Sequence, residues 1–309
     1  MKVPTSLGAD SPGTGRSGRL RGGRLGRFQG ALTDWYGPRA RPLRIRTTSE
    51  PWGVLVSEVM AQQTQIARVD ETWAVFMRRY PTPLMLAEAS TAEVVRAWAG
   101  LGYNRRAVNL QRAAAAIEVE HGGHVPLDIE ALEALPGVGP YTARAVAAIA
   151  FGRPVAAVDT NVRRLVSRVV AEPLTAKELQ VEADALVERG DPATWAHASM
   201  ELGATVCVSR RPLCDACPVS RWCRSAGRVE APERRKGAAG MSFERTTRWL
   251  RGRIVDRLRA LDDGAWTRLP DAIGEHGEAE IAAAVIGLER DGLLERRPDG
   301  SVRLPSGAT

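Results

Sequence analysis

Hydrophobic residues between positions 31 and 223 recur mostly at the three- and four-residue spacing of amphipathic helices. Alanine-rich stretches at 107–120 and 141–151 add high intrinsic helix propensity to this pattern. Short clusters of proline and glycine interrupt it at 81–83, 122–126, 136–140 and 172–173. Because strand patterns are scarce and these breaks leave helices of ordinary length, the sequence predicts an all-α body.

A different pattern follows residue 242. It predicts helices at 245–262, 268–273 and 278–291. The last stretch, LLERRPDGSVRLP, predicts a β-hairpin that turns at Asp299–Gly300. Three helices and a hairpin together predict a winged-helix-like module over 243–309. A polar, basic linker at 224–242 joins this module to the helical body.

The formal net charge of +7 is concentrated in two segments. Residues 1–30 carry six Lys/Arg and one Asp, and residues 224–240 carry five basic and two acidic residues. Residues 11–30 also hold seven glycines, so we expect 1–30 to be a disordered basic tail, unless a mis-chosen start codon produced it. Such cations attract phosphate without selecting a sequence, and they equally solubilise a chain.

The chain lacks the features that direct a protein to a membrane or out of the cell. No apolar run approaches the ~18 residues that a membrane span needs. No apolar segment precedes a small-residue cleavage site near the N-terminus. We therefore expect a cytoplasmic protein.

All four cysteines lie within 17 residues, in the spacing C-x6-C-x2-C-x5-C. A cytoplasmic protein rarely keeps disulfides, so this density indicates a metal or cluster site. Four thiolates bind either structural zinc or a [4Fe–4S] cluster. Zinc sites usually pair two short C-x-x-C units and only one is present, which favours the cluster. The predicted ligands are Cys207, Cys214, Cys217 and Cys223.

A glycine-rich turn, LPGVG at 135–139, lies between two predicted helices. Its two glycines let the backbone turn tightly and approach a ligand without an intervening Cβ. Pro140 suits the first position of the next helix, whose free backbone N–H groups can bind a phosphate oxygen without reading a base. Such a turn is weak evidence alone, but the cysteine loop follows 68 residues later.

Together, the cysteine spacing and the LPGVG turn resemble the endonuclease III and MutY-type DNA glycosylases, and the match covers about residues 34–223. The resemblance implies a mostly α-helical, helix-hairpin-helix fold of two lobes over 31–223, with a [4Fe–4S] loop at 207–223. It further implies a base-excision enzyme that acts as a monomer, associated with the nucleoid, on double-stranded DNA containing a mismatch or an oxidised base.

Hydrolysis of an N-glycosidic bond needs an acid for the leaving base and a negative charge near the cationic sugar. Glu58, in SEVMAQQTQ, and Asp159, in AVDTNVRR, lie where the MutY-type family carries its catalytic pair. The resemblance implies that Glu58 protonates the adenine ring and helps to activate water, that Asp159 stabilises the sugar, and that Asn161 orients the site. Without the resemblance, either acid would be interpreted as a helix-end or solvated carboxylate.

Position 141 separates two chemistries. Bifunctional relatives resembling endonuclease III carry a nucleophilic lysine there, which forms a Schiff base with the sugar and cleaves the strand. This chain carries Tyr141, which cannot do so. The sequence therefore predicts a monofunctional glycosylase that leaves an abasic site.

The target base must leave the double helix before it is cut. Tyr103, in WAGLGYNRRAVNL, lies where the family inserts a tyrosine into the DNA stack, the alternative being a half-buried core aromatic. Gln63 resembles the residue that fills the space left by the base, and Arg106 is expected near phosphates, as is Arg105. The remaining predicted DNA contacts are the backbone groups of Gly137, Val138 and Gly139.

Three residues of the predicted base pocket depart from the family pattern. Ile45 replaces a tryptophan while the neighbouring Arg46 is kept, and Ala61 replaces a leucine. His197 replaces a Gln or Glu ten residues before the first cysteine. A change of hydrogen-bonding group discriminates more strongly than a change of apolar bulk. His197 is thus the change most able to alter base choice, unless it is a packing or phosphate-side histidine.

The resulting hypothesis is an adenine glycosylase acting on A opposite 8-oxoguanine or guanine. The alternative is a mismatch glycosylase that removes thymine or uracil opposite guanine. A catalytically silent DNA-binding protein is a third hypothesis, which Glu58 and Asp159 disfavour. The region 241–309 is too short and too helical for the Nudix-like domain with which the family reads 8-oxoguanine, and we expect its basic first helix to dock on the DNA backbone or on a protein.

Overall fold

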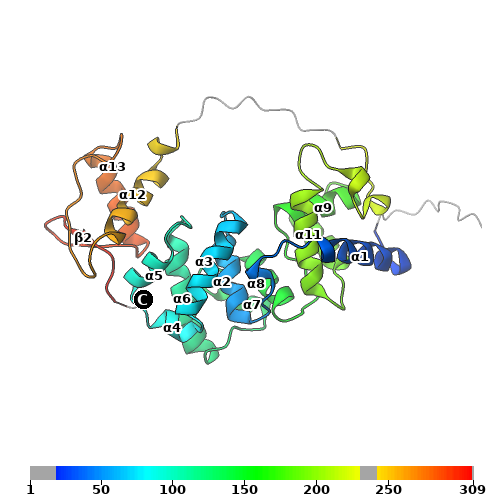
Figure 1. Cartoon of the computed structure of the whole chain (residues 1–309), viewed down its shortest axis with the longest axis horizontal. Helices are drawn as coiled ribbons and strands as arrows, with labels where there is room; N and C mark the ends of the chain where they lie inside the picture. The colour runs from blue at the N-terminus through cyan, green and yellow to red at the C-terminus, as the bar shows by residue number, and fades with distance from the viewer. Residues whose placement is uncertain (1–18, 230–241, 308–309) are drawn as a thin grey trace, which may run out of the picture.

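A computed structural model describes residues 19–229 and 242–307, which are mostly helical (Figure 1). The α-helices of this part of the chain are α1 (Gly22–Tyr36), α2 (Pro51–Ala61), α3 (Ile66–Arg79), α4 (Pro83–Ala87), α5 (Thr91–Ala97), α6 (Arg105–His121), α7 (Ile129–Ala134), α8 (Pro140–Ile149), α9 (Thr160–Val170), α10 (Ala176–Leu186), α11 (Pro192–Thr205), α12 (Thr247–Arg259) and α13 (Glu278–Arg290). Short 3-10 turns are η1 (Gly37–Arg39), η2 (Arg44–Arg46), η3 (Cys214–Ala216), η4 (Ser220–Trp222) and η5 (Phe243–Arg245). Two strands, β1 (Glu295–Arg296) and β2 (Val302–Arg303), pair antiparallel.

The first lobe comprises α2 to α8 around one hydrophobic core. Trp52, Phe76 and Trp98 are almost fully buried at its centre, and the rings of Phe76 and Trp98 meet edge to face at 5.9 Å. The indole of Trp52 donates to the Tyr80 carbonyl at 3.0 Å, so its polar atom is satisfied. Nearly every residue of α2 is buried. This packing fixes the helix end at which Glu58 lies.

The second lobe comprises α1 and α9 to α11, and α1 corrects the prediction that 1–30 is a disordered tail. Residues 22–30 are helical, whereas residues 1–18 lie outside the described residues. Phe28 and Leu32 are fully buried in the core of this lobe. With Leu25 and Tyr36 they form one apolar helical face. The surrounding glycines and arginines obscured this spacing in the sequence.

The C-terminal module contains α12, α13 and the hairpin, whose turn lies at the predicted position. The helix predicted at 268–273 is not formed. That segment is extended, because Thr267 pairs with Val302 of β2 and Ile273 pairs with His276. The module therefore has two of the three expected helices, and its winged-helix-like character stays a prediction. Most of the predicted linker, residues 230–241, lies outside the described residues.

The C-terminal module packs directly on the first lobe. A third hydrophobic cluster combines Leu250, Ile254 and Leu288 of the module with Val95 of α5 and Val108 of α6. The chain end also binds α5, because the backbone N–H groups of its first turn, at 91 and 92, donate to the carbonyls at 307 and 305. Figure 1 shows α12 and α13 beside α5 and α6, at the end of the molecule away from α9 and α11.

No helix in the described ranges is both long enough and apolar enough to cross a membrane.

Candidate active site

A cavity of about 270 Å³ lies between the two lobes and brings most of the predicted catalytic and pocket residues together. The predicted residues that line it are Ile45, Arg46, Glu58, Ala61, Tyr141, Asp159, Asn161 and His197. They come from η2, α2 and α8 of one lobe and from α9 and α11 of the other, so only the folded chain assembles the site. Met200 and Arg41 also line it and were not singled out from the sequence.

Glu58 lies in the last turn of α2 with its carboxyl group buried in this cavity. Its Oε2 atom has no hydrogen-bond partner among the described residues. Burial raises the pKa of Glu58 to about 7; the negative charge of Asp159 raises it further, and a hydrogen bond from Tyr141 opposes the shift. The side chain is thus a carboxylic acid for about half of the time at neutral pH, with one oxygen open to a ligand.

Asp159 caps the N-terminus of α9 and is held rigidly. One carboxylate oxygen accepts from the backbone N–H groups of Asn161 and Val162, at 2.8 and 2.7 Å. The other accepts from the Asn161 side-chain amide at 2.8 Å. Three donors, two of them from Asn161, fix this carboxylate in orientation. The role of the pair in catalysis stays a prediction at this point.

Asn161 is itself packed tightly against α11. A Cβ built on Gly203 would lie 2.6 Å from the Asn161 Cβ, so this position has room only for glycine. Arg164 donates to Asn161 Oδ1 at 2.8 Å and to the Cys207 carbonyl at 2.6 Å. The start of α9 is therefore tied to the beginning of the cysteine loop.

Tyr141, in the first turn of α8, forms part of the cavity wall. Its hydroxyl lies within hydrogen-bonding reach of Met200 Sδ, 3.7 Å away, and of the Glu58 carboxyl. Burial, followed by the charges of Glu58 and Asp159, raises the pKa of Tyr141 well above its usual value. The phenol is therefore neutral and serves as a hydrogen-bonding group.

A buried ion-pair network forms the rim of the cavity. Arg46 donates to Glu201 at 2.6 Å, and Arg41 contacts both oxygens of the same carboxylate. Burial alone would raise the pKa of Glu201, but these two arginines lower it. Arg46 was predicted in the pocket, whereas its partner Glu201 was missed, because nothing in SMELG distinguishes that acid from a solvated one.

His197 lies on α11 with its ring in the cavity. Burial, together with the nearby charge of Arg46, lowers the pKa of His197 to about 4. The imidazole is therefore neutral at pH 7 and can both donate and accept a hydrogen bond. Ile45 and Ala61 supply apolar wall nearby.

The predicted helix-hairpin-helix turn connects α7 to α8. Gly137 has φ +80°, and an added Cβ would lie 2.8 Å from the Asn109 Cβ, so both conformation and space require glycine. Its carbonyl accepts from Gln62 Nε2 at 3.3 Å, which links the turn to the end of α2. Val138 is buried, and the space beside Gly139 is open. The N-terminus of α8 is thus accessible to a phosphate.

Gln63 and Tyr103 share an uncommon backbone conformation. Their φ values are +56° and +46°, and within the described residues only Ala171 among other non-glycines has a positive φ. Such conformations cost free energy and concentrate at functional sites. Both side chains are exposed beside one groove. Strain of this kind at both predicted insertion residues supports their assignment.

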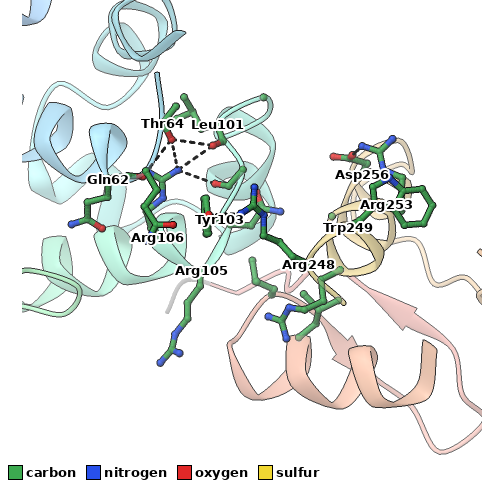
Figure 2. Close-up of a pocket in the computed structure, with 18 of the residues that line it drawn as sticks. Gln62, Thr64, Leu101, Tyr103, Arg105, Arg106, Arg248, Trp249, Arg253 and Asp256 are labelled. Carbon is green, nitrogen blue, oxygen red and sulfur yellow. Dashed lines mark hydrogen bonds and ion pairs between the residues drawn. The ribbon is translucent and has the colours of Figure 1, made fainter. Parts of the chain in front are cut away.

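Arg106 corrects a prediction, because it does not face phosphate. Its side chain is buried and donates to the carbonyls of Val59 and Met60 at the end of α2, at 2.9 and 2.7 Å. It also donates to the carbonyls of Leu101 and Gly102 before Tyr103. Figure 2 shows the bonds from this guanidinium to Thr64 and Leu101. Arg106 therefore holds the turns that carry Gln63 and Tyr103 together from inside the protein.

The four cysteines line one small cavity beside α9, with apolar walls from Leu165, Val206 and Val219. All four are free thiols. Arg168 donates to the Cys207 thiol at 3.2 Å and to two carbonyls of the following loop, which anchors that loop to α9. In the described residues no three His, Cys, Asp or Glu side chains are placed to hold a single metal ion.

Comparison with known proteins agrees with this geometry. The model of the HhH-GPD superfamily of base excision DNA repair proteins matches residues 56–189. The chain is 43% identical over 285 residues to the adenine DNA glycosylase of Mycobacterium tuberculosis, an alignment that covers 89% of this chain and 92% of that protein.

Two solved structures share the two-lobed body. A thermostable thymine-DNA glycosylase superposes with a TM-score of 0.63 at 27% identity, covering 66% of this chain and 97% of that one. A non-covalent endonuclease III–DNA complex superposes with a TM-score of 0.56 at 26% identity, covering 64% and 92%. The predicted mostly α-helical, helix-hairpin-helix glycosylase fold is therefore confirmed. Because the similarity to the mycobacterial protein runs through nearly the whole of both chains, this protein belongs to the adenine DNA glycosylase family.

Proposed function

We propose that this protein is a monofunctional glycosylase that hydrolyses the N-glycosidic bond of adenine paired with 8-oxoguanine or guanine in duplex DNA. The observation that carries the proposal is the cavity between the lobes. It holds a carboxyl group with a pKa of about 7 and a buried unpaired oxygen, beside a second carboxylate fixed by three donors. An acid and an anion in different environments are what departure of a base from a sugar requires.

In the proposed reaction, protonated Glu58 donates its proton to a ring nitrogen of the flipped adenine. The bond between C1′ and the base nitrogen breaks, and its electron pair leaves with the neutral base. Asp159 stabilises the cationic sugar through its negative charge, which acts strongly in this water-poor site. Water then adds to C1′ and returns a proton to Glu58, so that an abasic site remains and the enzyme is restored.

Strand cleavage by a Schiff base is not open to this site. It needs an amine nucleophile, and Tyr141 occupies the position where relatives carry lysine. Lys177, the lysine within the described residues, lies on α10 and does not line the cavity. The protein should therefore release the base and leave the strand intact.

We infer that DNA is held by elements around the cavity. The open N-terminus of α8 binds a phosphate, as the accessible space beside Gly139 supports. Tyr103 and Gln63 enter the base stack, which their exposure and positive φ support. We further propose that the protein acts as a monomer associated with the nucleoid, since the residues of one chain are enough to line the cavity.

The four-cysteine loop fits a [4Fe–4S] cluster. Four free thiols line one apolar cavity, and four thiolates are the usual ligands of such a cluster. Cys207, Cys214, Cys217 and Cys223 would bind it, and the cluster would supply covalent cross-linking of the loop. Absorbance near 400 nm with a matching iron content tests this assignment against zinc.

Single-turnover assays on A:8-oxoG, A:G, T:G and U:G duplexes test the proposed substrate. Adenine release without strand cleavage is expected from the first two. Release of thymine or uracil alone would instead support the alternative, a mismatch glycosylase acting on T:G or U:G. The residues at which the pocket departs from the family pattern, Ile45, Ala61 and the neutral His197, are compatible with that substrate. The near full-length similarity to an adenine glycosylase favours adenine.

A further inference from the structure

A groove of about 900 Å³ lies between the Tyr103 turn and α12 (Figure 2). One wall comes from segments 62–68 and 100–109 of the first lobe, and the other mainly from 243–259 of the C-terminal module. Seven arginines and one carboxylate, that of Asp256, line it. The proposed mechanism uses no residue of the C-terminal module, so it assigns no role to the arginines of the groove.

Arg248 differs from the other arginines that α12 contributes to the groove. Those are paired, Arg251 with Asp291 and both Arg253 and Arg259 with Asp256. Arg248 has no carboxylate partner in the described ranges. Its guanidinium lies 4.5 Å from the centre of the Tyr103 ring and donates to the Tyr103 hydroxyl at 2.5 Å. A full positive charge is therefore presented beside the residue predicted to enter DNA.

The middle of α12 leaves open space on its groove side. Gly252 follows Arg248 by one helical turn and also lines the groove, and a Cβ built there would meet no atom within 4 Å. Glycine in a helix interior costs about 1 kcal/mol relative to alanine. No close contact requires it, so packing does not explain the residue. It gives a ligand access to the helix backbone between arginines.

We propose that this groove binds a DNA sugar–phosphate backbone, and that Arg248 transfers from the Tyr103 ring to a phosphate when Tyr103 enters the base stack. The proposal rests on the proposed function only in taking duplex DNA as the substrate. Arginines on a helix with a bare backbone contact phosphates and read no base.

The test compares Arg248→Ala with Arg257→Ala, a matched control on the exposed part of α12 that does not line the groove. Binding to an undamaged duplex and to an A:8-oxoG duplex is measured from 50 to 200 mM salt. Loss of one phosphate contact lowers the slope of log K against log[salt] by about 0.9. We expect Arg248→Ala to lose affinity by the same factor on both duplexes and to show this smaller slope, and we expect Arg257→Ala to match the wild type.

A second variant, Gly252→Leu, fills the groove while improving helix propensity. It should weaken binding to both duplexes without lowering the melting temperature. Hydrogen exchange with a bound duplex should also protect the first turns of α12. The proposal would be overturned if Arg248→Ala kept the wild-type slope of log K against log[salt] and Gly252→Leu bound DNA as the wild type does. The groove would then be interpreted as a site for a protein partner. Base release by the wild type in the same preparation reports separately on the proposed function.

Discussion

The cavity around Glu58 and the groove beside Tyr103 differ in whether their basic side chains have carboxylate partners. In the cavity, Arg46 pairs with the buried carboxylate of Glu201, and His197 is uncharged at pH 7. In the groove, Arg248 keeps a positive charge without a carboxylate partner among the described residues, and it contacts an aromatic ring.

This difference indicates that the cavity selects the base, whereas the groove attracts DNA phosphates. Around a buried group such as Glu58 each hydrogen bond is strong and an unpaired polar atom is costly, so small changes alter which base reacts. In an open groove, cations attract any phosphate and their effect falls with salt. We therefore expect variants of the cavity to change chemistry at constant DNA affinity, and variants of the groove to do the reverse.

The strongest test of this separation removes the acid or the anion of the cavity. Glu58→Gln and Asp159→Asn should each lower the single-turnover rate of adenine release by about 10²- to 10⁴-fold, because a positioned proton donor or a stabilising charge is lost. DNA affinity measured by fluorescence anisotropy should change little. Excision that survives the loss of both carboxylates would contradict the mechanism.

Arg106 connects the two regions, and its replacement should affect both. Arg106→Ala leaves four backbone carbonyls without their buried donor, and we expect the free energy of unfolding to fall by about 3 kcal/mol. Chemical denaturation measures the loss. Arg105→Ala is the control, because that neighbouring side chain is largely exposed and should give a change near zero. If the two variants had the same free energy of unfolding, the structural role of Arg106 would be wrong and the earlier prediction of a phosphate contact would be favoured.

The pH dependence distinguishes the cavity from the groove without a mutation. Glu58 has a pKa of about 7 in the fold, so the rate of adenine release should fall about tenfold per pH unit above that value. Since the folded pKa exceeds the unfolded value of 4.5, the free energy of unfolding should decrease as pH rises from about 4.5 to 7, by about 3 kcal/mol in total. Glu58→Gln should remove both effects. A rate that rises through pH 7 to 9 would contradict the assignment of Glu58 as the acid.

The smallest expected effect concerns base choice. His197→Gln exchanges a neutral imidazole for an amide, one of the two groups that the family resemblance implies at this position, and it should shift the ratio of adenine to thymine release by about tenfold or less, since hydrogen-bonding capacity is kept. Competition between A:8-oxoG and T:G duplexes in one reaction measures this ratio. An unchanged ratio would assign His197 to packing.

The sequence predicted the cavity well and the groove poorly, for a physical reason. Glu58, Tyr141, Asp159 and the glycine turn lie in short motifs whose chemistry is local, so their types and spacing carry the information. Arg106 bonds to Val59 and Met60, 47 and 46 residues away, and Arg248 bonds to Tyr103, 145 residues away. Adjacent arginines at 105 and 106 look identical in sequence, yet packing buries one and exposes the other.

Composition misled the prediction at the N-terminus and in the C-terminal module. The glycines and arginines of residues 11–30 indicated disorder, but four apolar residues at helical spacing were enough to dock α1. Residues 268–273 have a helix-like pattern, but pairing of Thr267 with β2 favoured an extended chain. In both cases a contact with a distant element decided the local structure.

The position of the catalytic Asp159 depends on Gly203, a residue that takes no part in the proposed reaction. Because the Asn161 backbone and Cβ leave no room for a side chain there, any substitution would push the start of α9 and, with it, Asp159. A substitution at Gly203 should therefore lower the rate of base release, although the residue does not line the base cavity.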